Sequence, residues 1–137
     1  MKMNLDNLNS GLYEYLLRRT QRRIDSQIFD TDSYDFAAVY AITNLTNGKV
    51  YIGEAVNLNA RLMLHQAKLL GNYHDKPLLQ QDFNEGHKFT VTILERCEGH
   101  VTEGVLRVKE AYWRHEYLKL GYELYNIPMG RKKKSLK

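Results

Sequence analysis

Two tyrosines, an arginine and a histidine are spaced so that they could act together on a phosphate. Tyr40 and Tyr51 occur in two apolar runs joined by a tight turn, so their side chains can lie near each other on one face of a hairpin. Arg61 and His65 follow at positions i and i+4 of a helix-like segment, which places both on one helix face. An arginine fork can hold a phosphate, and a histidine can hydrogen-bond a phosphate or a hydroxyl. Taken singly, sheet packing and a solvated helix face are the better interpretations of the two pairs.

Glu110 is the most informative single residue. It belongs to a stripe at i, i+4, i+7 and i+11 with Leu106, Trp113 and Tyr117, so its carboxylate should face inward. A buried carboxylate is costly unless it is paired or binds a metal. The nearest neighbours in sequence on that face offer no obvious partner. Two interpretations stay open: a salt bridge to Arg61 or another distant cation, or a ligand for a hard metal ion.

Other chemical signals are weak. Asn126 lies between hydrophobic residues near the end of the chain, where it can pin backbone groups or touch substrate, and the structural role is favoured. The sequence has no glycine-rich phosphate loop, no Ser-His-Asp signature and no helical pair of metal-binding histidines. The remaining histidines lack ligand spacing. Nucleotide-driven and thiol chemistry therefore fit poorly, and no nucleotide cofactor is expected.

Size and composition indicate one domain in a reducing compartment. The chain has 137 residues, 43% of them hydrophobic, which is enough for a packed core. Its one cysteine, Cys97, cannot form an intrachain disulfide, as suits the cytoplasm. No apolar run approaches the ~20 residues of a membrane helix, and residues 1–10 lack the apolar core of a signal peptide. We expect a cytoplasmic protein without membrane contact, in the host cell if it is phage-encoded.

Positive charge is concentrated at the C-terminus. The net charge is +4, but the last eight residues carry five positive charges and the rest of the chain is close to neutral. Arg131, Lys132 and Lys133 in this tail are predicted to contact the phosphate backbone of DNA. A merely solubilising tail is the alternative.

An amphipathic helix is predicted over residues 10–29. One side carries a repeat every four positions, Leu12, Leu16, Thr20, Ile24 and Ile28, and arginines occupy the other. The arginine side either lies along DNA, through Arg18 and Arg22, or is an ordinary solvated face. The apolar side is a possible contact between copies of the chain.

A hairpin and a helix are predicted next. Residues 36–42 and 50–52 read as strands that turn at Asn47-Gly48, because both turn residues tolerate positive φ. Asn57 is predicted to cap a helix that runs to about Leu70 and ends at Gly71.

The second half of the chain alternates helix and strand. Asp75 is predicted to cap a short helix that ends before Gly86. Alternation over residues 88–95 predicts a half-buried strand, residues 102–120 a long helix, and residues 122–127 a short final strand. The fold class is α+β: a small three-stranded, mainly antiparallel sheet flanked by helices. Three segments are expected: an N-terminal helical extension at 1–35, a central domain at 36–130 and a basic tail at 131–137.

Together these motifs resemble the GIY-YIG endonuclease family over roughly residues 36–130. The family motif is Gly-Ile-Tyr, ten or eleven residues, then Tyr-Ile-Gly. Here the first half is Ala38-Val39-Tyr40, and the second half is intact. The matching segments are Tyr51-Ile52-Gly53, Asn57-Leu58 with Arg61 and His65, Glu110-Ala111-Tyr112-Trp113, and Tyr125-Asn126-Ile127.

The resemblance implies Mg²⁺-dependent hydrolysis of double-stranded DNA, with Mn²⁺ as a possible substitute. Glu110 would hold the metal and Arg61 would clamp the scissile phosphate. Tyr40 would be the general base, hydrogen-bonded to His65, and Tyr51 would orient water or phosphate. Asn126 completes the predicted catalytic set. The full set of predicted DNA contacts is Arg18, Arg22, Lys68, His74, Arg131, Lys132 and Lys133.

The resemblance leaves some points open. A non-catalytic DNA-binding or protein-interaction module on the same fold is the alternative function, since the first motif is altered at Ala38. The short segment after the motifs favours a freestanding nuclease of phage, mobile-element or restriction type over a repair enzyme. Cutting both strands with one active site needs a dimer or two successive nicks, so a homo-oligomer is also predicted.

Overall fold

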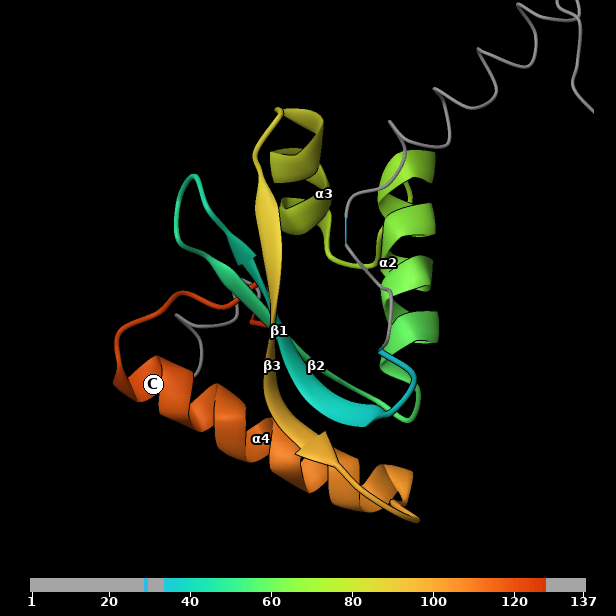
Figure 1. Ribbon diagram of the computed structural model, residues 1–137. Helices are drawn as coiled ribbons and strands as arrows, with labels where there is room; N and C mark the ends of the chain where they lie inside the picture. Colours follow the sequence, from blue (N-terminus) through green and yellow to red (C-terminus); the bar gives the residue numbers. More distant parts are fainter. Residues whose placement is uncertain (1–28, 30–33, 128–137) are drawn as a thin grey trace, which may run out of the picture.

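The computed structural model describes residue 29 and residues 34–127. The elements in chain order are β1 (Ala37–Asn44), β2 (Val50–Ala55), α2 (Leu58–Gly71), α3 (Pro77–Asn84), β3 (Phe89–Cys97) and α4 (Glu103–Lys119). The strands form one antiparallel sheet in the order β2-β1-β3 (Figure 1). The predicted α+β class with a three-stranded antiparallel sheet is confirmed. The predicted helix over 10–29, apart from Phe29, and the basic tail lie outside the described residues.

The central strand β1 is apolar from Ala37 to Ile42, as expected for a strand that is covered on both faces of the sheet. Tyr40 and Ile42 pack in a core with α2 and α3, whereas Val39 and Ala41 pack in a second core with α4. Figure 1 shows α2 and α3 on one side of the sheet and α4 on the other. The helices in the described part of the chain are all too short or too polar to cross a membrane.

The outer edge of β2 is partly covered by the closing segment. The short strand predicted at 122–127 is reduced to one parallel bridge between Val50 and Leu124. The Asn126 side chain continues the contact: its Oδ1 accepts from the Ile52 N–H at 2.9 Å, and its Nδ2 donates to the Ile52 carbonyl at 2.7 Å. Asn126 therefore pins the closing segment to β2.

Helix α2 begins at its predicted cap, Asn57, but it ends one residue later than predicted. The Asn57 side chain caps the helix by accepting from the Ala60 N–H at 2.8 Å. The left-handed residue after the helix is Asn72, with φ 65°, and Gly71 is still helical. Asparagine is one of the few residues that adopts this conformation at low cost.

Asp75 does not cap α3, contrary to the prediction. Lys76 is the N-cap residue and makes no side-chain capping bond, and Pro77 begins the helix. The Asp75 carboxylate instead pairs with Lys68 of α2, with Nζ and Oδ2 2.8 Å apart. The ion pair with Lys68 therefore takes the place of the predicted capping bond from Asp75 to α3.

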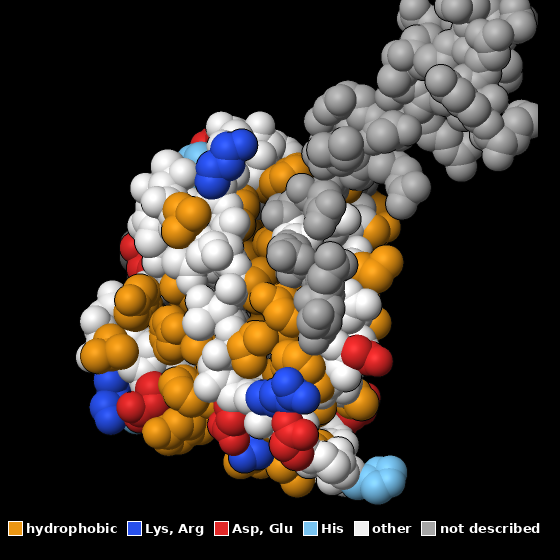
Figure 2. All heavy atoms as spheres, in the orientation of Figure 1, with side chains coloured by type: hydrophobic (Ala, Val, Ile, Leu, Met, Phe, Trp, Pro, Cys, Tyr) orange, Lys and Arg blue, Asp and Glu red, His pale blue; other side chains and the backbone are white. Residues whose placement is uncertain are grey.

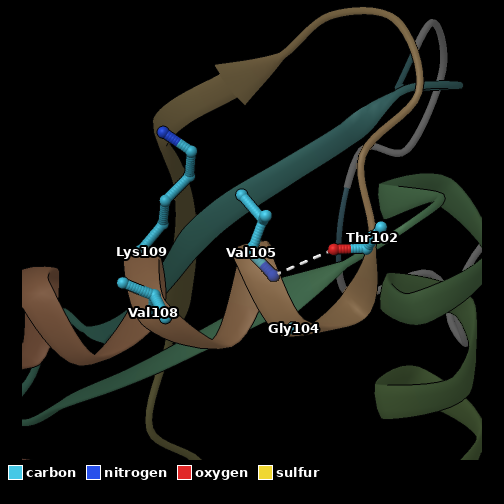
Figure 3. Close-up of a pocket in the computed structure, with 5 residues that line it drawn as sticks. All are labelled: Thr102, Gly104, Val105, Val108 and Lys109. Carbon is cyan, nitrogen blue, oxygen red and sulfur yellow. Dashed lines mark hydrogen bonds between the residues drawn. The ribbon is translucent and has the colours of Figure 1, made fainter.

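The last two elements extend close to their predicted limits. β3 is two residues longer at its end than predicted, and its register against β1 shifts between Val39 and Tyr40. Thr102 caps α4 by accepting from the Val105 N–H at 3.2 Å (Figure 3). This capped first turn borders a hollow of about 490 Å³. Its lining residues, drawn in Figure 3, are Thr102, Gly104, Val105, Val108 and Lys109.

Candidate functional site

The sheet register brings the two tyrosines together as predicted. Tyr40 lies opposite Gly53 and Ile42 lies opposite Tyr51, so the tyrosines are diagonal neighbours with ring centroids 6.2 Å apart. A Cβ at position 53 would lie 2.5 Å from the Tyr40 ring carbon that bears the hydroxyl. Gly53 therefore leaves the space that the Tyr40 ring fills.

Two histidines stand in line behind the Tyr40 hydroxyl. His65 Nε2 lies 2.7 Å from Tyr40 Oη, and His65 Nδ1 lies 2.8 Å from His74 Nε2. His74 is itself held at two points: its Nδ1 accepts from the Lys76 N–H at 3.0 Å, and its own N–H donates to Gln80 Oε1 at 3.0 Å. His74, predicted as a DNA contact, is thus a buried partner of His65.

A cleft of about 300 Å³ opens in front of this line. Tyr51 and Arg61 contribute to its wall, whereas Tyr40 is fully buried and lies behind Tyr51. Lys68 is also in the wall, where Asp75 neutralises its charge. The lining residues are Tyr51, Arg61, Leu64, His65, Lys68, His74, Asp75 and Lys76.

Glu110 faces the sheet side of α4, as its stripe predicted. Trp113 and Tyr117 of the same stripe pack into the second core, and the Glu110 side chain is 20% exposed. The expectation that no sequence neighbour could pair with Glu110 is wrong, because Arg114 Nε lies 3.3 Å from its carboxylate at i+4. The bridge is imperfect, since that buried Nε lacks a hydrogen bond of acceptable geometry.

The charge around Glu110 is only partly balanced. Burial raises the pKa of the Glu110 carboxyl, and the Glu54 carboxylate raises it further, against the lowering effect of Arg114. Glu54 lies on the edge strand β2, so a second carboxylate contributes to the same region.

The electrostatics connect Glu110 and Arg61 to the tyrosines. Burial raises the pKa of both Tyr40 and Tyr51, the Glu110 charge raises both further, and the Arg61 charge lowers both. Burial, with the positive charges nearby, lowers the pKa of His65 to about 3, and burial also lowers that of His74. Both histidines are therefore neutral at pH 7.

A second group of potential metal ligands lies outside the cleft. The ligand atoms of Asp82, Glu85 and His87 lie within 4.8 Å of one another. Asp82 Oδ2 already accepts from Asn47 at 3.0 Å and from the Tyr125 hydroxyl at 2.5 Å. These bonds tie the hairpin turn and the closing segment to α3, so Asp82 has a structural role. Asp82, Glu85 and His87 are spaced i, i+3 and i+5, so this group could have been noticed in the sequence.

The basic residues predicted to contact DNA are only partly described. Arg18, Arg22, Arg131, Lys132 and Lys133 lie outside the described residues. On the face drawn in Figure 2, the Lys and Arg side chains stand apart from one another with acidic side chains beside them. On that face of the described part, positive charge does not form a continuous band.

Three participants in the site were not singled out from the sequence. Arg114 could have been found from its i+4 spacing to Glu110, and Glu54 from strand alternation next to the intact Tyr-Ile-Gly motif. The role of the Lys76 amide could not have been found from the sequence, because every residue except proline has a backbone N–H.

Comparisons with known proteins agree with this geometry. The family model of the GIY-YIG catalytic domain matches residues 36–126. The solved catalytic domain of the homing endonuclease I-TevI is 29% identical, with a TM-score of 0.55, over 64% of this chain and 96% of that one. A mutant of the catalytic domain of the intron endonuclease I-TevI is 30% identical, with a TM-score of 0.53, over 58% of this chain and 81% of that one.

A search of curated proteins finds no match. The family model and both structures nevertheless support a nuclease function, because they describe the same catalytic domain. With two thirds of its length matched by that model, the chain belongs to the GIY-YIG family.

Proposed function

We propose that this protein is a metal-dependent endonuclease that hydrolyses phosphodiester bonds of double-stranded DNA in the cleft beside β2. The observation that carries the proposal is the meeting of Tyr51, Arg61 and a neutral His65 in the wall of one cleft. Glu110 is close enough for its charge to shift the pKa of both tyrosines. Attack on a phosphodiester needs an activated water and stabilisation of developing negative charge, and these side chains offer both.

The residues around Glu110 fit a hard divalent cation. Mg²⁺ prefers oxygen ligands and is commonly held by one or two carboxylates together with water and phosphate. Glu110 is half-buried, its ion pair with Arg114 is imperfect, and Glu54 adds a second negative charge. We propose Glu110 as the ligand of Mg²⁺, or of Mn²⁺ in its place, with Glu54 in support. When bound there, the metal would neutralise charge on the phosphate and the leaving oxygen.

The tyrosines are proposed to act in series. Tyr51 lines the cleft, where its hydroxyl can reach a water or a phosphate oxygen, and Tyr40 is fully buried behind it. The assignment of the general base to Tyr40 stays a prediction from the family resemblance. Burial keeps both phenols protonated at neutral pH, so Tyr40 would act as a base only when nearby positive charge favours its phenolate.

Arg61 is the proposed phosphate clamp. It lies on α2, and its positive charge favours the phenolate forms of Tyr40 and Tyr51. A guanidinium offers two parallel N–H donors to a phosphate, which fixes orientation as well as charge. Lys68 is a weaker candidate for DNA contact because Asp75 already pairs with it. Asn126 is proposed as a positioning residue, since both of its amide atoms bond Ile52.

The test is plasmid cleavage with a matched pair of variants. Supercoiled DNA is incubated with wild type, Glu110→Gln and Glu116→Gln, each with Mg²⁺ and with EDTA. Glu116 is on the same helix and pairs with Lys119 at its surface, so it controls for loss of a glutamate from α4. We expect wild type and Glu116→Gln to give nicked or linear product only with Mg²⁺. Glu110→Gln should be slower by roughly 10²-fold or more.

Two results would decide against parts of the proposal. Equal cleavage by Glu110→Gln and wild type would remove the metal-ligand role. Salt-sensitive binding of plasmid and genomic phage DNA without any product in Mg²⁺ or Mn²⁺ would instead indicate a non-catalytic DNA-binding module.

A further inference from the structure

One backbone amide fixes the direction of the hydrogen bonds behind Tyr40. The Lys76 N–H can only donate, and it lies 3.0 Å from His74 Nδ1. His74 Nδ1 must therefore be the unprotonated nitrogen of that ring. Since burial keeps His74 neutral, its proton is on Nε2.

The same reasoning passes to the next ring. His74 Nε2–H faces His65 Nδ1 at 2.8 Å, so His65 Nδ1 must accept. His65 is neutral and carries its proton on Nε2, which faces Tyr40 Oη at 2.7 Å. His65 is therefore the donor to Tyr40, and the tyrosine oxygen accepts. The opposite tautomers would set an N–H of His74 against the Lys76 N–H.

The ring geometry suits N–H···N bonding in the ring planes. The His65 and His74 planes are within 16° of parallel, and their centroids are 5.0 Å apart. With facing nitrogens only 2.8 Å apart, this centroid separation means that the rings meet edge to edge, where the nitrogen lone pair points.

The proton of the Tyr40 hydroxyl is left free to point elsewhere. The neighbouring phenol is that of Tyr51, whose ring centroid lies 6.2 Å from that of Tyr40. The three hydrogen bonds all run one way, from the Lys76 amide through both histidines to the Tyr40 oxygen. Tyr51, beside Tyr40, lines the cleft.

We infer that His74, itself fixed by the Lys76 amide, is a positioning residue that holds His65 in its Nε2–H tautomer and so makes His65 a hydrogen-bond donor to Tyr40. In this arrangement His65 cannot take the proton of Tyr40. It stabilises negative charge on the Tyr40 oxygen and leaves the hydroxyl proton to point away from His65. The consequence for catalysis rests on the proposed nuclease function, but the tautomer itself does not.

Nuclear magnetic resonance of the full-length protein tests the inference directly. In ¹⁵N-labelled protein, correlations between ring nitrogens and carbon-bound ring protons identify the protonated nitrogen of each histidine. We expect His65 and His74 both to be protonated at Nε2 at pH 7. His74→Leu removes the donor and should leave His65 as a mixture of tautomers. His74→Gln sets an amide donor near the former Nε2 and should keep His65 protonated at Nε2.

A wild-type His65 protonated at Nδ1, or a His65 tautomer unchanged by His74→Leu, would overturn the inference. The wild-type spectrum decides the question even if the leucine variant does not fold. In single-turnover cleavage, we expect a loss of about tenfold or more for His74→Leu and partial recovery for His74→Gln. The expected tautomers without cleavage by any protein would uphold the inference and defeat the proposed function.

Discussion

His65 is the residue on which the site depends most, because it is buried, neutral and bonded on both ring nitrogens. A charged imidazolium here would lie near Arg61 and Lys68, and burial would leave it poorly solvated. The neutral ring instead links the tyrosine pair to the loop before α3. Its spacing from Arg61 was visible in the sequence, but its contact with His74 depends on the turn after α2.

The neutrality of His65 makes stability depend on pH. Its pKa is about 3 in the folded protein and near 6.5 in the unfolded chain. Between these values the unfolded chain binds a proton that the folded protein does not, so the free energy of unfolding falls as pH falls from 6.5 to 3. Above pH 6.5 this contribution is constant.

Urea unfolding at pH 7, 5.5 and 4.5 measures this effect in wild type and His65→Gln. Glutamine does not titrate, so the variant should lose less stability between pH 7 and pH 4.5 than wild type does. The carboxylates titrate in both proteins and cancel in the comparison. Parallel pH profiles for the two proteins would show that His65 is not held neutral by the fold.

At the scale of elements, the pairing of β1 with β2 creates the space for the first tyrosine. Gly53 lies opposite Tyr40, and the Tyr40 hydroxyl is fixed by His65, so the ring cannot move aside freely. Gly53→Ala should destabilise the protein by about 1–3 kcal/mol through overpacking, and it should slow DNA cleavage by displacing the hydroxyl. Thermal unfolding and plasmid cleavage measure the two effects.

Gly104→Ala is the matched control for this substitution. Gly104 lies in the first turn of α4, and an added Cβ there would meet only the Thr102 hydroxyl at 3.8 Å. Alanine is also the better helix former, so this variant should be at least as stable as wild type. An equally stable and active Gly53→Ala would contradict the packing argument.

The sequence predicted the elements better than their ends. The periodicity of the hydrophobic residues and the turn residues located the two hairpin strands β1 and β2. They also located α2, β3 and α4, because hydrophobic patterning is a local signal. Asp75 was assigned to the wrong partner because Lys68, seven residues earlier, is brought back to it by the end of α2. Local capping rules do not include such tertiary competition.

At the scale of the whole molecule, the site is assembled around the edge strand β2. Tyr51 and Glu54 belong to this strand, α2 brings Arg61 to the cleft, and α4 brings Glu110 to the other side of the sheet. The sequence named most of these side chains through spacing and family resemblance. It could not show that Tyr40 is fully buried beside Tyr51, or that the Glu54 charge acts on Glu110, because both follow from how the layers pack.

The most direct test of the central claim, that DNA is hydrolysed in this cleft, is the single-turnover cleavage rate of Tyr51→Phe against wild type. Tyr112→Phe is the control, because Tyr112 is an exposed tyrosine on α4. We predict that Tyr51→Phe cuts supercoiled plasmid roughly 10²- to 10⁴-fold more slowly with unchanged DNA affinity, whereas Tyr112→Phe keeps the wild-type rate. Cleavage by Tyr51→Phe at the wild-type rate would contradict the account.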